Sequence, residues 1–271
     1  MPQTITEKVV QTHAVGLPDG AEVLAGDMVT VRPAHVMTHD NTGAVLPKFR
    51  TIGARHVADP RQPVFALDHN VQDRTEANLE KYAMIEAFAT QEGIRFHPAG
   101  AGIGHQLMIE NGFVHPGALV VASDSHSNMY GAVGAVGTPV VRTDAAAIWA
   151  TGMTWWLVPR TVKVVLEGEL RPGVTGKDVI ITLCGLYNSG EVLNAAVEFH
   201  GAGAATLSMD DRMTISNMTT EWGALVGWFG YDRKTSHYLR GRAATLELLD
   251  IQDRLTGEMI DGWDANPPLP D

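Results

Sequence analysis

The sequence predicts a layered α/β/α domain with a mostly parallel β-sheet. Short apolar runs that end in polar residues alternate with segments of helical periodicity, and glycine-rich turns separate them. Strands that alternate with helices are typical of a parallel sheet covered by helices. The chain has 271 residues, of which 45% are hydrophobic, and this is enough to bury a large core.

The elements follow in order after an N-terminal part that we expect to be short and irregular, because glycines and prolines interrupt its first 60 residues. We then expect a strand over 64–70, a helix over 76–93 that ends at Gly93, a strand, turn and helix within 94–112, and a strand over 118–126. A helix over 143–153, a strand over 161–170, a helix beginning near Asp178, a glycine-rich loop at 201–203 and a helix around 214–228 follow.

The character of the chain changes at residue 243. We expect an α/β domain over residues 1–242. Residues 243–271 are expected to form one amphipathic helix and a tail rich in proline and aspartate.

The charge and the cysteine content of the chain limit its possible binding partners and its cellular compartment. With 20 Lys and Arg against 31 Asp and Glu, the formal net charge is −11, and no basic stripe is present to neutralise phosphates. The sequence has no apolar run long enough for a membrane span, no secretory signal and no Arg-rich leader. One cysteine fits a reducing compartment. We therefore expect a cytoplasmic protein with a small-molecule substrate and without nucleic-acid or membrane partners; a homo-oligomer is compatible with these features.

Polar clusters stand where the predicted strands end. Asp68 and His69 follow one strand, and residues 124–126 (Asp-Ser-His) follow another. His105 comes after a glycine-rich turn, where exposed N–H groups favour anions. Ligands of parallel α/β sheets bind beyond the carboxyl ends of the strands, so we expect these groups to converge on one pocket. The alternative is that they are helix caps and hydrogen-bonded turns.

Three further possibilities are an amide–carboxylate pair on one helix face, a zinc site and a hydrolase triad. Asn217 and Glu221 are four residues apart, which places them on one face of a predicted helix. A zinc site could draw on Asp124 and His126 with the more distant His39 and His69, but we predict no metal, because zinc requires three or four ligands held by further partners. A hydrolase triad is not expected, since the sequence has no nucleophile elbow.

The motifs together resemble a known family. In order, they read MTHDNTGAV, LDHNVQDRTEANLEKY, GIGHQ, VASDSHSNMYGAVGAVGTPVVRTDAAAIWATG, PGVTGKDVI, AAVEFHGAG and ISNMTTEWGA. Over roughly Thr4 to Arg242 the chain resembles the N-terminal part of the aconitase superfamily. It is nearest to the fungal homoaconitases, and the isopropylmalate dehydratase large subunits are further off.

The resemblance implies roles for ten residues. Those implied to be catalytic are Asp68, His69, His105, Asp124, His126 and Glu221. Those implied to contact substrate are His39, Asp40, Ser125 and Asn217.

The cysteine content departs from the family. The cluster cysteines of the family and its swivelling domain lie beyond the matched part. Cys184 matches no cluster-ligand motif, and a cubane cluster needs several thiolates. We therefore expect no cofactor in this chain alone. An iron–sulfur cluster is expected only where another part supplies the cysteines.

Three functions stay open from the sequence. The first is a cluster-free lyase, isomerase or cyclase that acts on a small organic substrate in secondary metabolism. The second is a fragment or large subunit of a true iron–sulfur homoaconitase, a hydro-lyase of lysine biosynthesis. The third is a pseudoenzyme that binds a partner. The survival of the polar motif residues favours an enzyme over the third.

Overall fold

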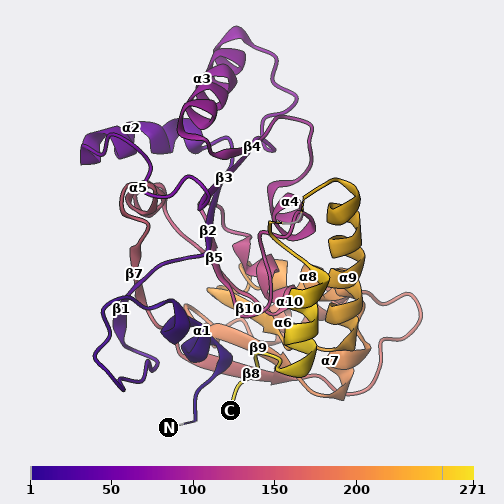
Figure 1. Cartoon of the computed structure of the whole chain (residues 1–271). Coiled ribbons are helices and arrows are strands. Elements are labelled where there is room, and N and C mark those ends of the chain that lie inside the picture. Colours follow the sequence, from indigo (N-terminus) through magenta and orange to yellow (C-terminus); the bar gives the residue numbers. More distant parts are fainter. Residues whose placement is uncertain (1, 252) are drawn as a thin grey trace.

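A five-stranded parallel sheet forms the centre of the main layer (Figure 1). The computed structural model describes residues 2–251 and 253–271. The strand order is β4-β3-β2-β5-β6, and all neighbours are parallel. The strands are β2 (His35–Thr38), β3 (Pro63–Ala66), β4 (Arg95–His97), β5 (Leu119–Ala122) and β6 (Val136–Pro139). This confirms the predicted α/β class.

Helices cover both faces of this sheet, because side chains of successive strand residues point to opposite faces. In β3, Phe65 packs with one helical layer and Val64 with the other. The first layer consists of α2 (Thr42–Ile52), α3 (Glu76–Glu92) and α5 (Arg142–Thr151). The second consists of α4 (Gly104–Glu110), the 3₁₀ helix η1 (Ser127–Val133), α9 (Arg233–Leu248) and α10 (Gly257–Ala265).

A smaller parallel sheet adjoins the main one through η1 and has the strand order β10-β9-β8. Its strands are β8 (Thr161–Val165), β9 (Ala196–His200) and β10 (Val226–Phe229). The helices packed around it are α1 (Ile5–His13), α6 (Gly176–Leu186), α7 (Ala202–Thr206) and α8 (Met209–Met218). The antiparallel pair β1 (Met28–Val31) and β7 (Thr154–Leu157) completes the strands.

The junction between the two sheets leaves no room for a side chain at Gly131. A Cβ added there would lie 1.8 Å from the carbonyl oxygen of Gly227 in β10, so η1 and β10 touch backbone to backbone. We expect Gly131→Ala to lower the free energy of unfolding by about 3 kcal/mol or more, because the two backbones would have to separate.

Gly241 offers a matched control for this substitution. It lies in helix α9, and a Cβ there would meet nothing within 4 Å. Gly241→Ala is expected to leave stability unchanged or to raise it by up to about 1 kcal/mol. Urea unfolding of both variants measures the difference, and equal stabilities would contradict the close approach.

The helix predicted around 214–228 is wrong. Helix α8 ends at Met218, the chain turns through Gly223 with φ of 95°, and residues 226–229 form strand β10 beside β9. The apolar sequence of β10 carries no period that separates a buried strand from a buried helix, and pairing with β9 decides between them.

Both ends of the chain also differ from expectation. The first 60 residues contain α1, β1, β2 and α2 rather than irregular structure. A capping box between Thr4 and Glu7 begins α1, and Pro47 lies inside α2, where proline normally argues against a helix.

The C-terminal part holds two helices, α9 and α10, which pack together (Figure 1). Helix α9 runs across residues 242 and 243. The boundary between an α/β domain and a C-terminal part at this point therefore stays a prediction from composition. In the part of the chain that the structure describes, no helix is long and apolar enough to span a bilayer.

Candidate functional site

The polar clusters lie at the carboxyl edge of the main sheet, where strand order changes direction between β2 and β5. Connections leave these two neighbouring strands toward opposite sides, which opens a crevice in folds of this kind. His39 and Asp40 follow β2, Asp68 and His69 follow β3, and Asp124 follows β5.

Asp124 is the hub of the cluster. One of its carboxylate oxygens lies 2.7 Å from Nε2 of His105 and accepts from the backbone N–H of His126 at 2.9 Å. The other lies 3.3 Å from Nε2 of His69 and 3.7 Å from Nε2 of His39. Burial alone would raise the pKa of Asp124. These hydrogen bonds and the nearby imidazoles outweigh burial and hold the pKa well below its usual range, so the group is an anion at neutral pH.

His69 lies between two carboxylates. Its Nδ1 is 2.6 Å from Asp68, and its Nε2 faces Asp124. Burial of the ring opposes protonation, but Asp68 and Asp124 outweigh it and raise the pKa of His69. The ring therefore favours the imidazolium form, and with its side chain 49% exposed it can pass a proton to a ligand.

Asp40 holds the loop that carries this pair. Its carboxylate accepts the backbone N–H groups of residues 68, 69 and 70 and the hydroxyl of Tyr82. Burial would raise the pKa of Asp40, but these four donors lower it. Asp40 is thus a positioning residue in this structure, whereas the sequence placed it among the substrate contacts.

The hydroxyl of Tyr130 orients His105. It lies 3.0 Å from Nδ1 of His105, while Nε2 faces Asp124. Burial raises the pKa of Tyr130 far above its ordinary value, so the hydroxyl keeps its proton and stays a neutral hydrogen-bond partner of Nδ1. His105 carries a proton on Nε2 and donates it to the Asp124 anion.

A second imidazole–carboxylate pair bridges the two sheets. Nε2 of His126 lies 2.7 Å from Oε1 of Glu221, and both side chains are partly exposed. Ser125 joins the pair through its hydroxyl, 3.2 Å from Nδ1 of His126, and its carbonyl accepts from the hydroxyl of Thr220. Glu221 therefore reaches the site from the turn between α8 and β10.

Of the ten residues named from the sequence, nine belong to this network. The exception is Asn217, whose amide contacts the sulfur of Met129 at 3.8 Å. Because α8 ends at Met218, Asn217 and Glu221 do not share a helix face, which corrects the spacing argument. Sequence reasoning missed Tyr82 and Tyr130, which lie in helices and read as core residues.

An open cavity of about 740 Å³ adjoins the network. His39, Asp124 and Ser125 form one side of it, and Lys48 of α2 and Arg142 of α5 line it as well. Its size suits a small organic ligand.

Four of these groups also have the spacing of metal ligands. The ligand atoms of His39, Asp40, Asp68 and His69 all lie within 4.8 Å of one another. The carboxylates of Asp40 and Asp68 already accept hydrogen bonds from backbone N–H groups, so an ion would compete with the bonds that shape the loop.

Cys184 does not complete a cluster site. It lies on α6, and burial together with the nearby Glu221 raises the pKa of its thiol, whereas a metal ligand must be a thiolate. A four-iron cluster requires several such ligands, and the chain has one cysteine. The residues of this chain by themselves do not fit the cluster that the resemblance implies.

The chain is similar to curated fungal proteins named "Homoaconitase, mitochondrial". It is 58% identical to that of Cryptococcus neoformans over 247 residues, which are 91% of this chain and 34% of the relative. It is 60% identical to that of Aspergillus niger over 90% of this chain and 32% of the relative. It is 53% identical to that of Neurospora crassa over 100% of this chain and 35% of the relative. The chain spans about a third of the length of these relatives.

These names correct the expected compartment. The relatives are called mitochondrial, so the expectation of a cytoplasmic protein is wrong. That expectation rested on the N-terminal sequence and on one cysteine. A single cysteine excludes an internal disulfide but does not distinguish one reducing compartment from another.

The family assignment agrees with the resemblance and with the fold. The profile of the Aconitase family (aconitate hydratase) matches residues 7–259. The matched range contains both parallel sheets and every residue of the network around Asp124. This chain belongs to the Aconitase family.

Proposed function

We propose that this chain carries the proton-transfer and orienting part of a hydro-lyase site of homoaconitase type. The observation that carries the proposal is the network in which Asp124 joins His105 and His69, with the His126–Glu221 pair beside it, in a member of the Aconitase family. The names of the relatives support this reaction class over the cluster-free isomerase or cyclase. Because the relatives are named mitochondrial, we also propose that this protein acts in mitochondria.

Addition or removal of water moves a proton to or from the departing hydroxyl and another at the neighbouring carbon. His69 suits the first step, because its raised pKa keeps a proton available near neutral pH and its ring is half exposed. Asp68 and Asp124 stabilise its imidazolium form. The His126–Glu221 pair is a second exchangeable proton site, and Ser125 and His39 orient the ligand.

The proposed substrate is a small hydroxy acid with several carboxylates. Lys48 and Arg142 line the cavity, and no acceptor for either side chain is seen among the described residues, so both can receive carboxylates. The relatives' length beyond this chain would supply the thiolate ligands of a cluster, since Cys184 cannot.

A chimera tests the proposal. Residues 4–242 of this chain replace the matching part of the Aspergillus niger homoaconitase, and hydration of homoaconitate is followed by absorbance. We expect the chimera to be active. Arg142→Gln should raise KM by about 10-fold or more, the effect of losing one charge-assisted hydrogen bond, with a smaller change in kcat. A folded chimera without turnover would overturn the proposed function.

The pH response of His69 is a further expected result that requires no turnover. Because folding raises its pKa, the stability from His69 is complete below the ordinary value near 6.5 and is lost as pH rises through the folded pKa. Asp68→Asn removes one of the two charges and should move the folded pKa down. NMR titration of the His69 ring in the unaltered chain and in Asp68→Asn measures both values. An unchanged titration in Asp68→Asn would contradict the role of this pair.

A further inference from the structure

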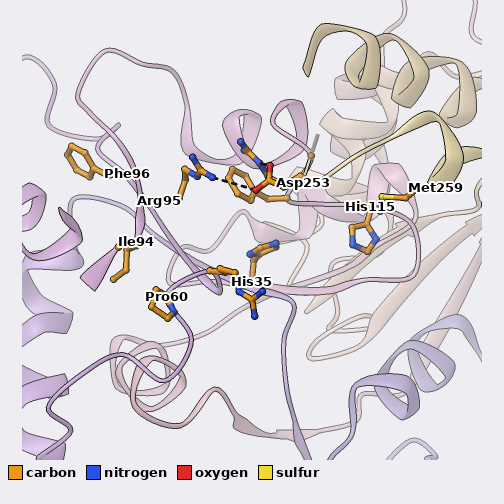
Figure 2. A pocket seen from close by; sticks show the side chains of 13 residues that line it. His35, Pro60, Ile94, Arg95, Phe96, His115, Asp253 and Met259 are labelled. Atoms are coloured by element: carbon orange, nitrogen blue, oxygen red, sulfur yellow. Dashed lines mark hydrogen bonds and ion pairs between the residues drawn. The ribbon is translucent and has the colours of Figure 1, made fainter. Parts of the chain in front are cut away.

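A second polar cavity lies at the opposite edge of the main sheet (Figure 2). His35 begins β2, Arg95 begins β4, and Arg61 lies just before β3, so the cavity is at the amino ends of strands whose carboxyl ends carry the catalytic network. Its volume is about 630 Å³. One wall comes from the C-terminal part of the chain: Asp253 and Arg254 lie in the connection between α9 and α10, and Met259 lies in α10.

Arg254 is a largely buried residue of the cavity wall. Its side chain is only 8% exposed, and its guanidinium lies over the ring of Phe113 at 4.4 Å. Nη1 donates to the carbonyl of Asn111 at 3.1 Å, and Nε donates to Asp253 at 3.2 Å. A guanidinium has five N–H donors, so these two bonds leave further donors for a ligand in the cavity that Arg254 lines.

The backbone nearby is shaped to bring Arg254 in. Gly112 has φ of 73°, and a Cβ there would lie 2.8 Å from Cβ of Leu255 and 3.3 Å from Cβ of Arg254. Only glycine allows this approach without strain. The loop after α4 and the connection after α9 are therefore in direct contact where both line the cavity.

The lining carries positive charge in an acidic chain. Arg61, Arg95 and Arg254 line the cavity, and Asp253 is the one carboxylate among the lining residues of the described chain. Arg61 is paired with Asp59 at 3.1 Å, whereas Arg95 and Arg254 share Asp253, which lies 3.7 Å from Arg95. Arg95 is half exposed and only loosely paired, so its guanidinium is open to a second anion.

Two partly buried imidazoles, His35 and His115, also line the cavity. Burial is the largest cause that lowers the pKa of His35, to about 4, and the charge of Arg254 contributes to the lowering. Burial likewise lowers the pKa of His115. Both lowered pKa values favour the neutral ring, and a bound anion would offset the positive potential of Arg254 at His35.

We propose that this cavity binds a small organic anion at a site separate from the catalytic network. Its oxygens pair with Arg95 and Arg254, and its apolar part packs against Ile94 and Met259, which line the same cavity. An arginine guanidinium binds a carboxylate or a phosphate through the same pair of N–H donors, so the anion could carry either group. A bound anion would tie β4 to the connection between α9 and α10.

Calorimetric titration of the chain with inorganic phosphate and, separately, with succinate tests the site and distinguishes the two chemistries. We expect at least one of them to bind the unaltered chain and to shift the NMR signals of the His35 and His115 rings. Arg95→Gln, a change at a half-exposed side chain, should weaken binding by about 10-fold or more.

Arg142→Gln is the matched control, because it removes a charge from the other cavity and should leave the anion-induced shift of the His35 ring unchanged. Neither anion binding to the unaltered chain would overturn the proposal, and so would equal affinity in Arg95→Gln. The readouts are affinity and ring shifts rather than turnover, so failure here would leave the proposed hydro-lyase function standing.

Discussion

Turnover of the chimeric enzyme is expected to fall by about 10²-fold or more when His69 is replaced by alanine. The imidazole lies between Asp68 and Asp124 and holds the most available proton of the network, and alanine leaves both carboxylates without it. Its side chain is half exposed, so the melting temperature should change little. Steady-state kinetics measure the loss.

His237→Ala is the matched control for this substitution. His237 is an exposed histidine on α9, and its removal is expected to leave turnover within about twofold. If His69→Ala keeps full activity in a folded chimera, the Asp68–His69 pair has only a structural role in the loop, and the proton donor lies elsewhere.

Removal of the Asp232 carboxylate is expected to cost about 4 kcal/mol of unfolding free energy. Its partner Arg212 is 1% exposed and forms two parallel hydrogen bonds to it, 3.1 Å from Nη1 to Oδ1 and 2.5 Å from Nη2 to Oδ2. Asp232→Ala leaves this guanidinium buried without its counter-charge. It also removes the N-cap of α9, where Asp232 accepts from the N–H groups of residues 234 and 235.

A second variant separates these two effects. Asp232→Asn keeps a capping oxygen but loses the charge, and the double variant Arg212→Met/Asp232→Ala removes both ions. The double variant should recover most of the stability, because a packed apolar side chain replaces a buried pair at little cost. Urea unfolding measures all three variants, and a loss below about 1 kcal/mol in Asp232→Ala would mean that the pair behaves like an exposed one.

The fold class was predictable because buried parallel strands are short apolar runs in any context. Residues 119–122 are buried at every position, and so are residues 63–66, which makes them visible in the sequence. The end of α3 at Gly93 was predictable for a local reason, since its left-handed φ of 73° is easily reached only by glycine.

The convergence of Asp68, His69 and Asp124 was also predictable, because parallel strands end at one edge of a sheet. The identity of the central group was not. Asp124 became the hub through side-chain contacts with His105, His69 and His39, and no spacing in the sequence encodes these distances.

The place of Glu221 in the site could be known only from the tertiary structure, for a different reason. The apolar run after it reads equally well as helix or strand, and only pairing of β10 with β9 makes it a strand. That pairing turns the chain at Gly223 and brings Glu221 to His126 from the second sheet. The roles of the Tyr82 and Tyr130 hydroxyls were not predictable, because an aromatic residue at an apolar helix position is normally interpreted as a core residue.

By itself, the sequence determined strands β3, β4, β5 and β8, the order of the motifs and the polar residues that follow the strands, because burial and turn chemistry act over a few neighbouring residues. Only the tertiary structure decided which imidazole faces which carboxylate and which tyrosine holds each in place. It also decided that Arg95 and Arg254 meet across a cavity at the far edge of the sheet. Such contacts join residues far apart in the chain, and their geometry depends on how the layers pack.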